Sequence, residues 1–232
     1  MKLCETKKLH YGKYLYKLAI VNSCSYFFRT EFQPDGKLKY ARQRLDAVHR
    51  NSSTNTTEWG IEVPHTHNSK FVETIPMSHF WDAIEIYRHL LKEKEYKIRC
   101  EHTHLIIYSN NRKSMIELGN KLKQPYTEFW EPNPETIQTL LSEENIIISN
   151  KPPVYQYKVT LGNKKGSASL AKWIESNTNL ASMGERALGY CKDESYVYGY
   201  YFHVRDEKTL LLIQMMVGDN IQRVDKFVYI EQ

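Results

Sequence analysis

The sequence predicts an α+β protein made of two tandem modules, each with the element order βαββαβ. One observation is an internal repeat, because the strand-like segment at 14–22 has the same pattern of aromatic and apolar residues as the segment at 155–163. The other is that similar helical and strand-like patterns follow in both halves, and each half closes with an aromatic strand, at 125–131 and at 223–231. Two halves with the same order indicate a duplication.

The second half, predicted to form a module over residues 154–232, has the clearer pattern. A strand at 154–161 leads into a helix at 167–177, for which Ser167 is a suitable N-cap residue. The remaining predicted elements are strands at 186–192 and 196–205, a helix at 206–217 with Asp206 as its cap, and a strand at 223–231.

The first half, predicted to span residues 1–131, has the same order with an insertion at about 22–77 after its first strand. Its predicted elements are a strand at 13–21, a helix at 79–93 capped by Ser78, strands at 95–101 and 103–109, a helix at 111–123 and a strand at 125–131. Residues 132–153 are expected to link the modules, with a short helix from Pro134 capped by Asn133 and an apolar strand at 146–148.

The insertion contains an amphipathic helix at about 37–50. Leu38, Ala41, Leu45 and Val48 recur on one face at helical spacing. The other face has the densest basic stripe in the chain, formed by Lys37, Lys39, Arg42, Arg44 and Arg50. The polar stretch that follows, 51–57, is predicted to be a loop.

The order βαββαβ is that of ferredoxin-like folds, so we expect helices on one face of each sheet and an open second face. Strand alternation predicts which side chains lie there. Tyr198, Tyr200, Phe202 and Val204 are expected in the core. The predicted open faces combine basic and aromatic residues: His102, His104, Ile106 and Tyr108, then Gly199, Tyr201, His203 and Arg205, with Lys17, Lys97, Arg99 and Lys158 from neighbouring strands.

This combination is typical of surfaces that bind single-stranded nucleic acid, because cations attract phosphates and flat rings stack on bases. We therefore expect a single-stranded nucleic-acid-binding protein, for RNA rather than DNA, without strong sequence readout. The residues expected to contact it are Lys39, Arg42, Arg44 and Arg50 from the basic helix, and Lys97, Arg99, Tyr108, Lys158, Tyr201, His203 and Arg205 from the sheet faces.

The segment 196–204 resembles the RNP1 strand of RNA-recognition motifs. Gly199, Tyr200 and Phe202 match that motif, whereas Tyr198 replaces its basic residue and Tyr201 its small one. The resemblance implies RNA binding on the open sheet face, with contact roles for Tyr201, His203 and Arg205. The alternative is that these rings are sheet core, or that the two sheets bury them against each other, since aromatic residues are common in strands.

Two His-Thr-His triplets suggest a nuclease as an alternative. Placed on one strand, His102 and His104 would lie on the same face and could bind one divalent metal ion; the triplet at 65–67 is in an irregular stretch. The pair resembles the His-hydrophobic-His strand of HUH endonucleases, which would imply a tyrosine nucleophile such as Tyr87 or Tyr126. Tandem ferredoxin-like chains also resemble Cas6-type ribonucleases, which would imply a catalytic role for His49, His79 or His89 and no metal. Outside the HUH alternative we expect no cofactor.

Composition limits the remaining classes. The chain has 232 residues with a net charge of +5, 4 dispersed Cys and no run of apolar residues long enough to span a membrane, so we expect a cytoplasmic protein without disulfides. No P-loop, GxSxG, HExxH or EF-hand pattern occurs. With 17 Tyr, the chain is also compatible with a structural or assembly protein, such as a phage-encoded accessory protein, whose Tyr-rich sheets bind protein partners.

Overall fold

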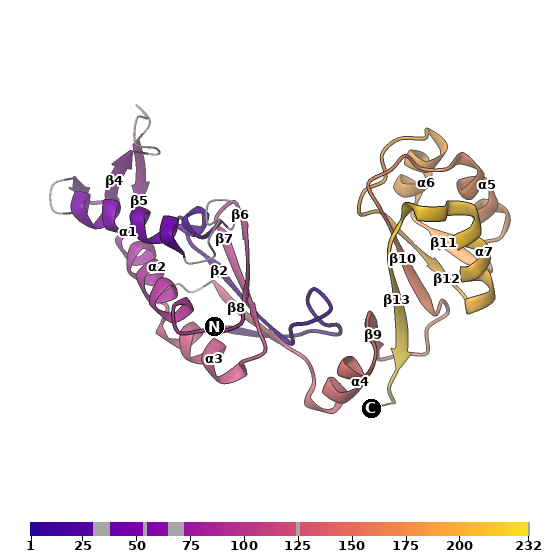
Figure 1. The fold of residues 1–232 in the computed structure, drawn as a ribbon, viewed down its shortest axis with the longest axis horizontal. Helices are drawn as coiled ribbons and strands as arrows, with labels where there is room; N and C mark the ends of the chain where they lie inside the picture. Colours follow the sequence, from indigo (N-terminus) through magenta and orange to yellow (C-terminus); the bar gives the residue numbers. More distant parts are fainter. Residues whose placement is uncertain (30–37, 53–54, 65–71, 124–125, 232) are drawn as a thin grey trace. The chain divides into compact units, whose positions relative to one another are not determined.

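The computed structural model describes residues 1–29, 38–52, 55–64, 72–123 and 126–231, and it has a mixed α+β fold (Figure 1). The chain divides into two compact units. The first unit comprises Met1–Thr6 and Lys13–Pro132, and the second comprises Lys7–Gly12 and Asn133–Gln232. None of the helices in the described ranges is both long enough and apolar enough to cross a membrane.

The first unit contains a five-stranded sheet with the order β1-β8-β2-β7-β6. Its strands are β1 (Lys2–Glu5), β2 (Tyr16–Val21), β6 (Lys97–Glu101), β7 (His104–Ser109) and β8 (Thr127–Glu131). β1 pairs in parallel with β8, and every other pair in the sheet is antiparallel. The central strand is therefore β2, which carries the first copy of the internal repeat.

Two helices cover one face of this sheet, α2 (Met77–Leu90) and α3 (Arg112–Lys121) (Figure 1). Phe80 and Ile86 of α2 and Leu118 of α3 are buried with Leu18 and Leu105 of the sheet, which gives the unit its core. Both helices were predicted, although α2 begins at Met77, with Pro76 as its N-cap residue in place of the expected Ser78.

The insertion folds onto the same unit. It contains a 3-10 turn, η1 (Ser25–Phe28), the helix α1 (Lys39–Ser52) and a small sheet of β3 (Thr56–Thr57), β4 (Gly60–Pro64) and β5 (Val72–Ile75). α1 buries Ala41, Leu45 and Val48 as its spacing predicts. The described part of the predicted loop at 51–57 instead ends α1 and forms β3.

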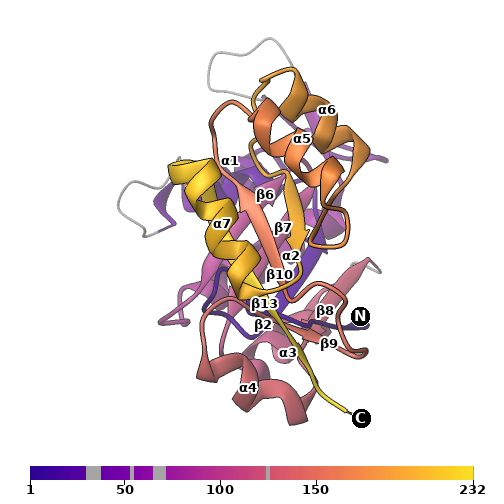
Figure 2. The same ribbon diagram turned by 90° about the vertical axis from the view of Figure 1, so that its right-hand side faces the viewer.

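The second unit has a sheet of the order β11-β12-β10-β13-β9. Its strands are β9 (Ile146–Ser149), β10 (Tyr157–Leu161), β11 (Ala181–Met183), β12 (Tyr201–Val204) and β13 (Ile221–Tyr229). The helices α5 (Ala168–Ser176), α6 (Glu185–Lys192) and α7 (Glu207–Val217) lie on one face of it (Figures 1 and 2). Short 3-10 turns at Pro134–Thr136 and Gly218–Asn220 and the helix α4 (Ile137–Ser142) complete the unit.

Several predictions for the second unit need correction. The segment predicted as a strand at 186–192 is the helix α6, which buries Ala187 and Cys191 one turn apart. The strand predicted at 196–205 is limited to β12, because Gly199 has a φ of +77° in a preceding turn, and Tyr198 is 64% exposed instead of buried. Most of the predicted linker belongs to the unit, since β9 pairs in parallel with β13.

The two sheets have the same strand order and the same polarity. β10, β12, β11 and β13 of the second unit correspond to β2, β7, β6 and β8 of the first. The agreement extends to an additional edge strand that precedes each repeat, because β1 runs parallel to β8 as β9 runs parallel to β13. Helices join the corresponding strands in both units, and α6 is the main addition in the second.

Candidate nucleic-acid interface

Five side chains gather on the open sheet face of the second unit: Tyr155, Lys158, Tyr201, His203 and Phe227. We call them the second-unit cluster. The register of the sheet explains their position, because Lys158 of β10 lies opposite His203 of β12. The alternate residues of these strands, Val159, Phe202 and Val204, are fully buried on the helix-covered face. The lysine, tyrosine and histidine therefore lie together on the side that alternation predicts.

His203 is the centre of the cluster. Its ring centroid lies 6.2 Å from that of Tyr155, 5.5 Å from that of Tyr201 and 5.9 Å from that of Phe227. The Lys158 ammonium lies 3.8 Å from the centroid of the Tyr201 ring, which is within cation–π distance. Tyr201 remains 46% exposed, so the cluster offers a ring to solvent beside a cation.

The charges of the cluster are only partly compensated. Burial, followed by repulsion from Lys8, lowers the pKa of Lys158, and Asp225 acts in the opposite direction. Burial and then the charge of Lys158 lower the pKa of His203. Asp225 is 3% exposed and is also paired with Arg223 at 3.1 Å. An approaching anion would therefore find the Lys158 ammonium partly removed from water.

The open face of the first unit has a related arrangement. Lys17 of β2 lies opposite Tyr108 of β7 on one side and Trp130 of β8 on the other. Its ammonium is 4.1 Å from the centroid of the Trp130 ring. Sequence reasoning missed Trp130, although alternation from the fully buried Phe129 would have placed it on this face.

The predicted contacts from β6 and β7 differ in exposure. Lys97 and Arg99 are exposed on β6, and Arg99 forms an ion pair with Glu101. Tyr108 lies on the predicted face but is only 5% exposed, with its ring centroid 6.4 Å from that of Tyr14. Its ring is thus a packing group and not an exposed stacking surface.

The basic helix α1 places three of its four predicted contacts in solvent, namely Lys39, Arg42 and Arg50. Arg44 differs, because its Nη2 donates to the Tyr26 hydroxyl at 3.1 Å and its guanidinium lies 5.2 Å from the centroid of the Phe27 ring. Tyr26 in turn donates to Glu73 at 2.6 Å. Arg44 therefore holds α1 against η1 and is unsuited to a phosphate contact.

Comparison with known proteins gives no relative from which a function could be transferred. No family model matches the chain, and no curated protein or solved structure is significantly similar to it.

The histidine pair predicted to bind a metal is not arranged as expected. His104 begins β7, but His102 lies in the hairpin turn between β6 and β7 with a φ of +49°, so the two do not share one strand face. In the part of the chain that the structure describes, no group of three or more His, Cys, Asp or Glu residues could hold a metal ion. The triplet at 65–67 lies outside the described residues.

Most of the other residues named for nuclease chemistry make packing or hydrogen-bond contacts within the first unit. His79 Nδ1 accepts from the backbone N–H of Ser23 at 3.0 Å, and the ring of His49 stacks on Phe80 at 6.4 Å between centroids. Tyr87 packs against the core of the first unit, whereas Tyr126 is exposed. No two of these residues form a nucleophile and base pair among the described contacts.

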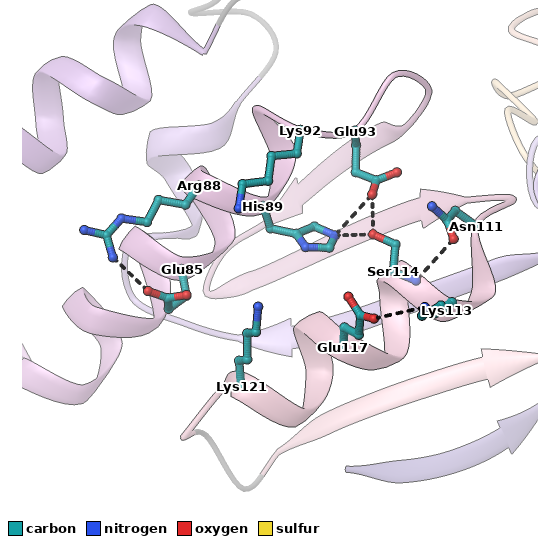
Figure 3. Close-up of a pocket in the computed structure, with 10 residues that line it drawn as sticks. All are labelled: Glu85, Arg88, His89, Lys92, Glu93, Asn111, Lys113, Ser114, Glu117 and Lys121. Carbon is teal, nitrogen blue, oxygen red and sulfur yellow. Dashed lines mark hydrogen bonds and ion pairs between the residues drawn. The ribbon is translucent and has the colours of Figure 1, made fainter.

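A separate polar cavity of about 550 Å³ lies between α2 and α3 (Figure 3). Within it, the Ser114 hydroxyl donates to Glu93 and lies 2.9 Å from His89 Nε2, while Glu93 Oε1 is 3.8 Å from the same nitrogen. In a Ser-His-acid triad the acid would bind the other ring nitrogen, so this cluster does not activate the serine in that way. Burial is the main cause of the lowered pKa of His89. The cluster ties α2 to α3.

Proposed function

We propose that the protein binds single-stranded nucleic acid, RNA in preference to DNA, through the open sheet face of its second unit. The observation that carries this proposal is the Lys158 ammonium, 3.8 Å from the centroid of a half-exposed Tyr201 ring whose neighbour is His203. A base can stack on the ring while the adjacent cation binds a phosphate, and neither contact requires a particular sequence.

We also propose that both units are ferredoxin-like modules, and that the second uses its sheet as an RNA-recognition motif does. The orders β8-β2-β7-β6 and β13-β10-β12-β11, each with helices on one face, support this proposal. The preference for RNA rests on the sequence likeness of residues 196–204 to the RNP1 strand, although only Tyr201–Val204 form β12 and Phe202 is buried on the helix-covered face. In this scheme Tyr201 and His203 are the base contacts, and Arg205 lies exposed directly after β12.

Basic residues outside the cluster would add affinity that depends on salt. Lys39, Arg42 and Arg50 on α1 are exposed, although Arg42 is 3.8 Å from Asp46 in an ion pair. Such surface cations attract phosphates through solvent and contribute mainly to the rate of association. They are auxiliary to the sheet face in this proposal.

A protein partner is the second candidate. Tyr196 and Tyr198 are largely exposed in the loop before β12, and Leu211 and Met215 are exposed on α7. Exposed aromatic and apolar side chains are frequent in protein interfaces. Binding through them would depend little on salt, whereas phosphate binding would weaken steeply as salt rises.

The test is fluorescence anisotropy with labelled oligouridine, oligothymidine and a duplex at two salt concentrations. Tyr201→Ala should weaken binding of oligouridine by about 5- to 150-fold, because one base–aromatic stack contributes about 1–3 kcal/mol. Tyr198→Ala is the matched control, since this tyrosine is exposed in the nearby loop and has no ring contact with the cluster among the described contacts. It should leave affinity nearly unchanged.

Lys158→Met tests the charge. It should reduce the steepness of the salt dependence by about one phosphate contact, since each contact contributes about 0.7 to the logarithmic slope for a single strand. Absence of binding by the wild type to any single strand, or equal losses for Tyr201→Ala and Tyr198→Ala, would refute the proposed site. Salt-independent binding of a protein would favour the second candidate.

A further inference from the structure

We propose that the first unit carries a second site for single-stranded nucleic acid, centred on Lys17 and Trp130, so that one chain has two sites of the same kind. This inference rests on the proposed function of the second-unit cluster. It extends that function to residues on a different sheet. An experiment can refute the first-unit site without refuting the second-unit site, and the reverse.

The central strands place the two lysines at equivalent positions. The start of β2 lies within the segment Tyr14-Leu15-Tyr16-Lys17, and the start of β10 lies within Tyr155-Gln156-Tyr157-Lys158. The next residue along each strand, Leu18 or Val159, is fully buried under the helices. Both lysines therefore emerge from the middle of the sheet onto its open face.

The neighbouring rings correspond as well. Lys17 lies opposite Tyr108 of β7, and Lys158 lies opposite His203 of the corresponding strand β12. The first tyrosine of each repeat packs on that ring, Tyr14 on Tyr108 at 6.4 Å and Tyr155 on His203 at 6.2 Å between centroids. The same three-residue arrangement thus occurs once in each unit.

Each lysine also lies over a second ring, although a different strand supplies it. Lys17 is 4.1 Å from the centroid of Trp130 on β8, and Lys158 is 3.8 Å from that of Tyr201 on β12. Burial is the largest cause of the lowered pKa of Lys17, as it is for Lys158. A half-buried cation against a partly exposed ring is therefore common to both faces.

The first-unit site is the smaller of the two. Tyr14 and Tyr108 are buried, so Trp130 is the ring of this group that remains partly accessible to a base. Lys97 of β6 is exposed and pairs in register with Tyr108, on the side of β7 away from β2. It adds a cation beside the same group of residues. One stacked base and the adjacent phosphates would occupy it, and its affinity should be lower than that of the second-unit cluster.

The experiment uses the full chain and a short oligouridine, with stoichiometry measured by native mass spectrometry and affinity by anisotropy. The wild type should bind two oligonucleotides. Tyr201→Ala should retain one weaker site, and adding Trp130→Ala should lower that residual affinity by a further 5- to 150-fold, the equivalent of about 1–3 kcal/mol for a lost stack. Trp81→Ala is the matched control, because Trp81 lies on α2, the helix-covered side of the same sheet, and is 45% exposed.

The outcomes separate the two proposals. If Tyr201→Ala abolishes all binding, or if Trp130→Ala has no effect in the Tyr201→Ala background, the first-unit site is refuted and the second-unit site stands. If Trp130→Ala removes binding and Tyr201→Ala does not, the second-unit site is refuted. A wild type that binds no single strand refutes both. Lys17→Met removes the charge but keeps the apolar stem, so it should reduce the salt dependence of binding at the remaining site. This variant replaces Trp130→Ala in the test if Trp130→Ala does not fold.

Discussion

Adjacent residues of β12 offer a direct test of the sheet register on which the site depends. Phe202 is fully buried, whereas Tyr201 is 46% exposed on the opposite face. Phe202→Ala removes about 150 Å² of buried apolar surface, which at about 25 cal/mol per Å² corresponds to about 4 kcal/mol, in line with the 3–5 kcal/mol typical of buried Phe→Ala changes. Tyr201→Ala leaves no closed cavity and should cost about 1–2 kcal/mol.

Urea unfolding of the full chain, followed by far-UV circular dichroism, measures both losses. With a slope of about 2 kcal/mol per M, Phe202→Ala should lower the midpoint of the transition that involves the second unit by about 2 M, and Tyr201→Ala by less than about 1 M. Phe202→Leu, a smaller truncation, preserves the comparison if the alanine variant does not fold. Equal losses, or the reverse order, would mean that β12 is displaced by one residue, since such a shift exchanges the two faces of a strand.

The remaining predictions concern acid stability and a glycine. Lowering the pH below 6.5, the ordinary pKa of histidine, should destabilise both units, because His89 and His203 have lowered pKa values when folded and the unfolded chain binds protons first. The loss should stay below about 1.4 kcal/mol per pH unit for each partly solvated histidine; thermal melts across this range measure it, and a stability that rises on acidification would contradict it. Gly60→Ala should destabilise the small sheet of the insertion, because Gly60 has a φ of +145° and a Cβ there would lie 2.3 Å from the carbonyl oxygen of Ile75. Gly184→Ala, with open space around its Cβ, is the control, and equal melting temperatures for the two variants would contradict the prediction.

The elements that sequence reasoning located well have strong local signals. The helix predicted at 167–177 is α5, and the Ser167 side chain accepts from the Leu170 backbone N–H as an N-cap. Asp206 caps α7 in the same way through Thr209. Cap chemistry and helical spacing are properties of a few neighbouring residues, so they can be read without knowing the tertiary structure.

The elements that sequence reasoning missed depend on distant contacts. β11 has three residues, too few to show a period of two, and its existence depends on pairing with β12. α6 buries only Ala187 and Cys191, and Gly189 within it weakens the helical pattern. These elements are stabilised mainly by the sheet and helices against which they pack.

The residues of the candidate site also differ in whether local sequence or distant contacts determine their position. Lys158, Tyr201 and His203 were predictable, because alternation around buried Val159 and Phe202 fixes their face. The burial of Tyr108 was not, because it involves a ring contact with Tyr14 from outside the strand. Arg44 belonged to the basic stripe in sequence, but contacts with η1 decide where its guanidinium lies.

The equivalent lysines of the two sheets lower the stability of the folded chain through their burial. Removing part of an ammonium group from water costs free energy, as the lowered pKa values of Lys17 and Lys158 indicate. An apolar side chain in the middle of the sheet would avoid that cost. The ring contact, with Trp130 in one unit and Tyr201 in the other, compensates in part, as do the carboxylates of Glu128 and Asp225. The proposed role in binding an anion would account for a lysine in both copies of the repeat.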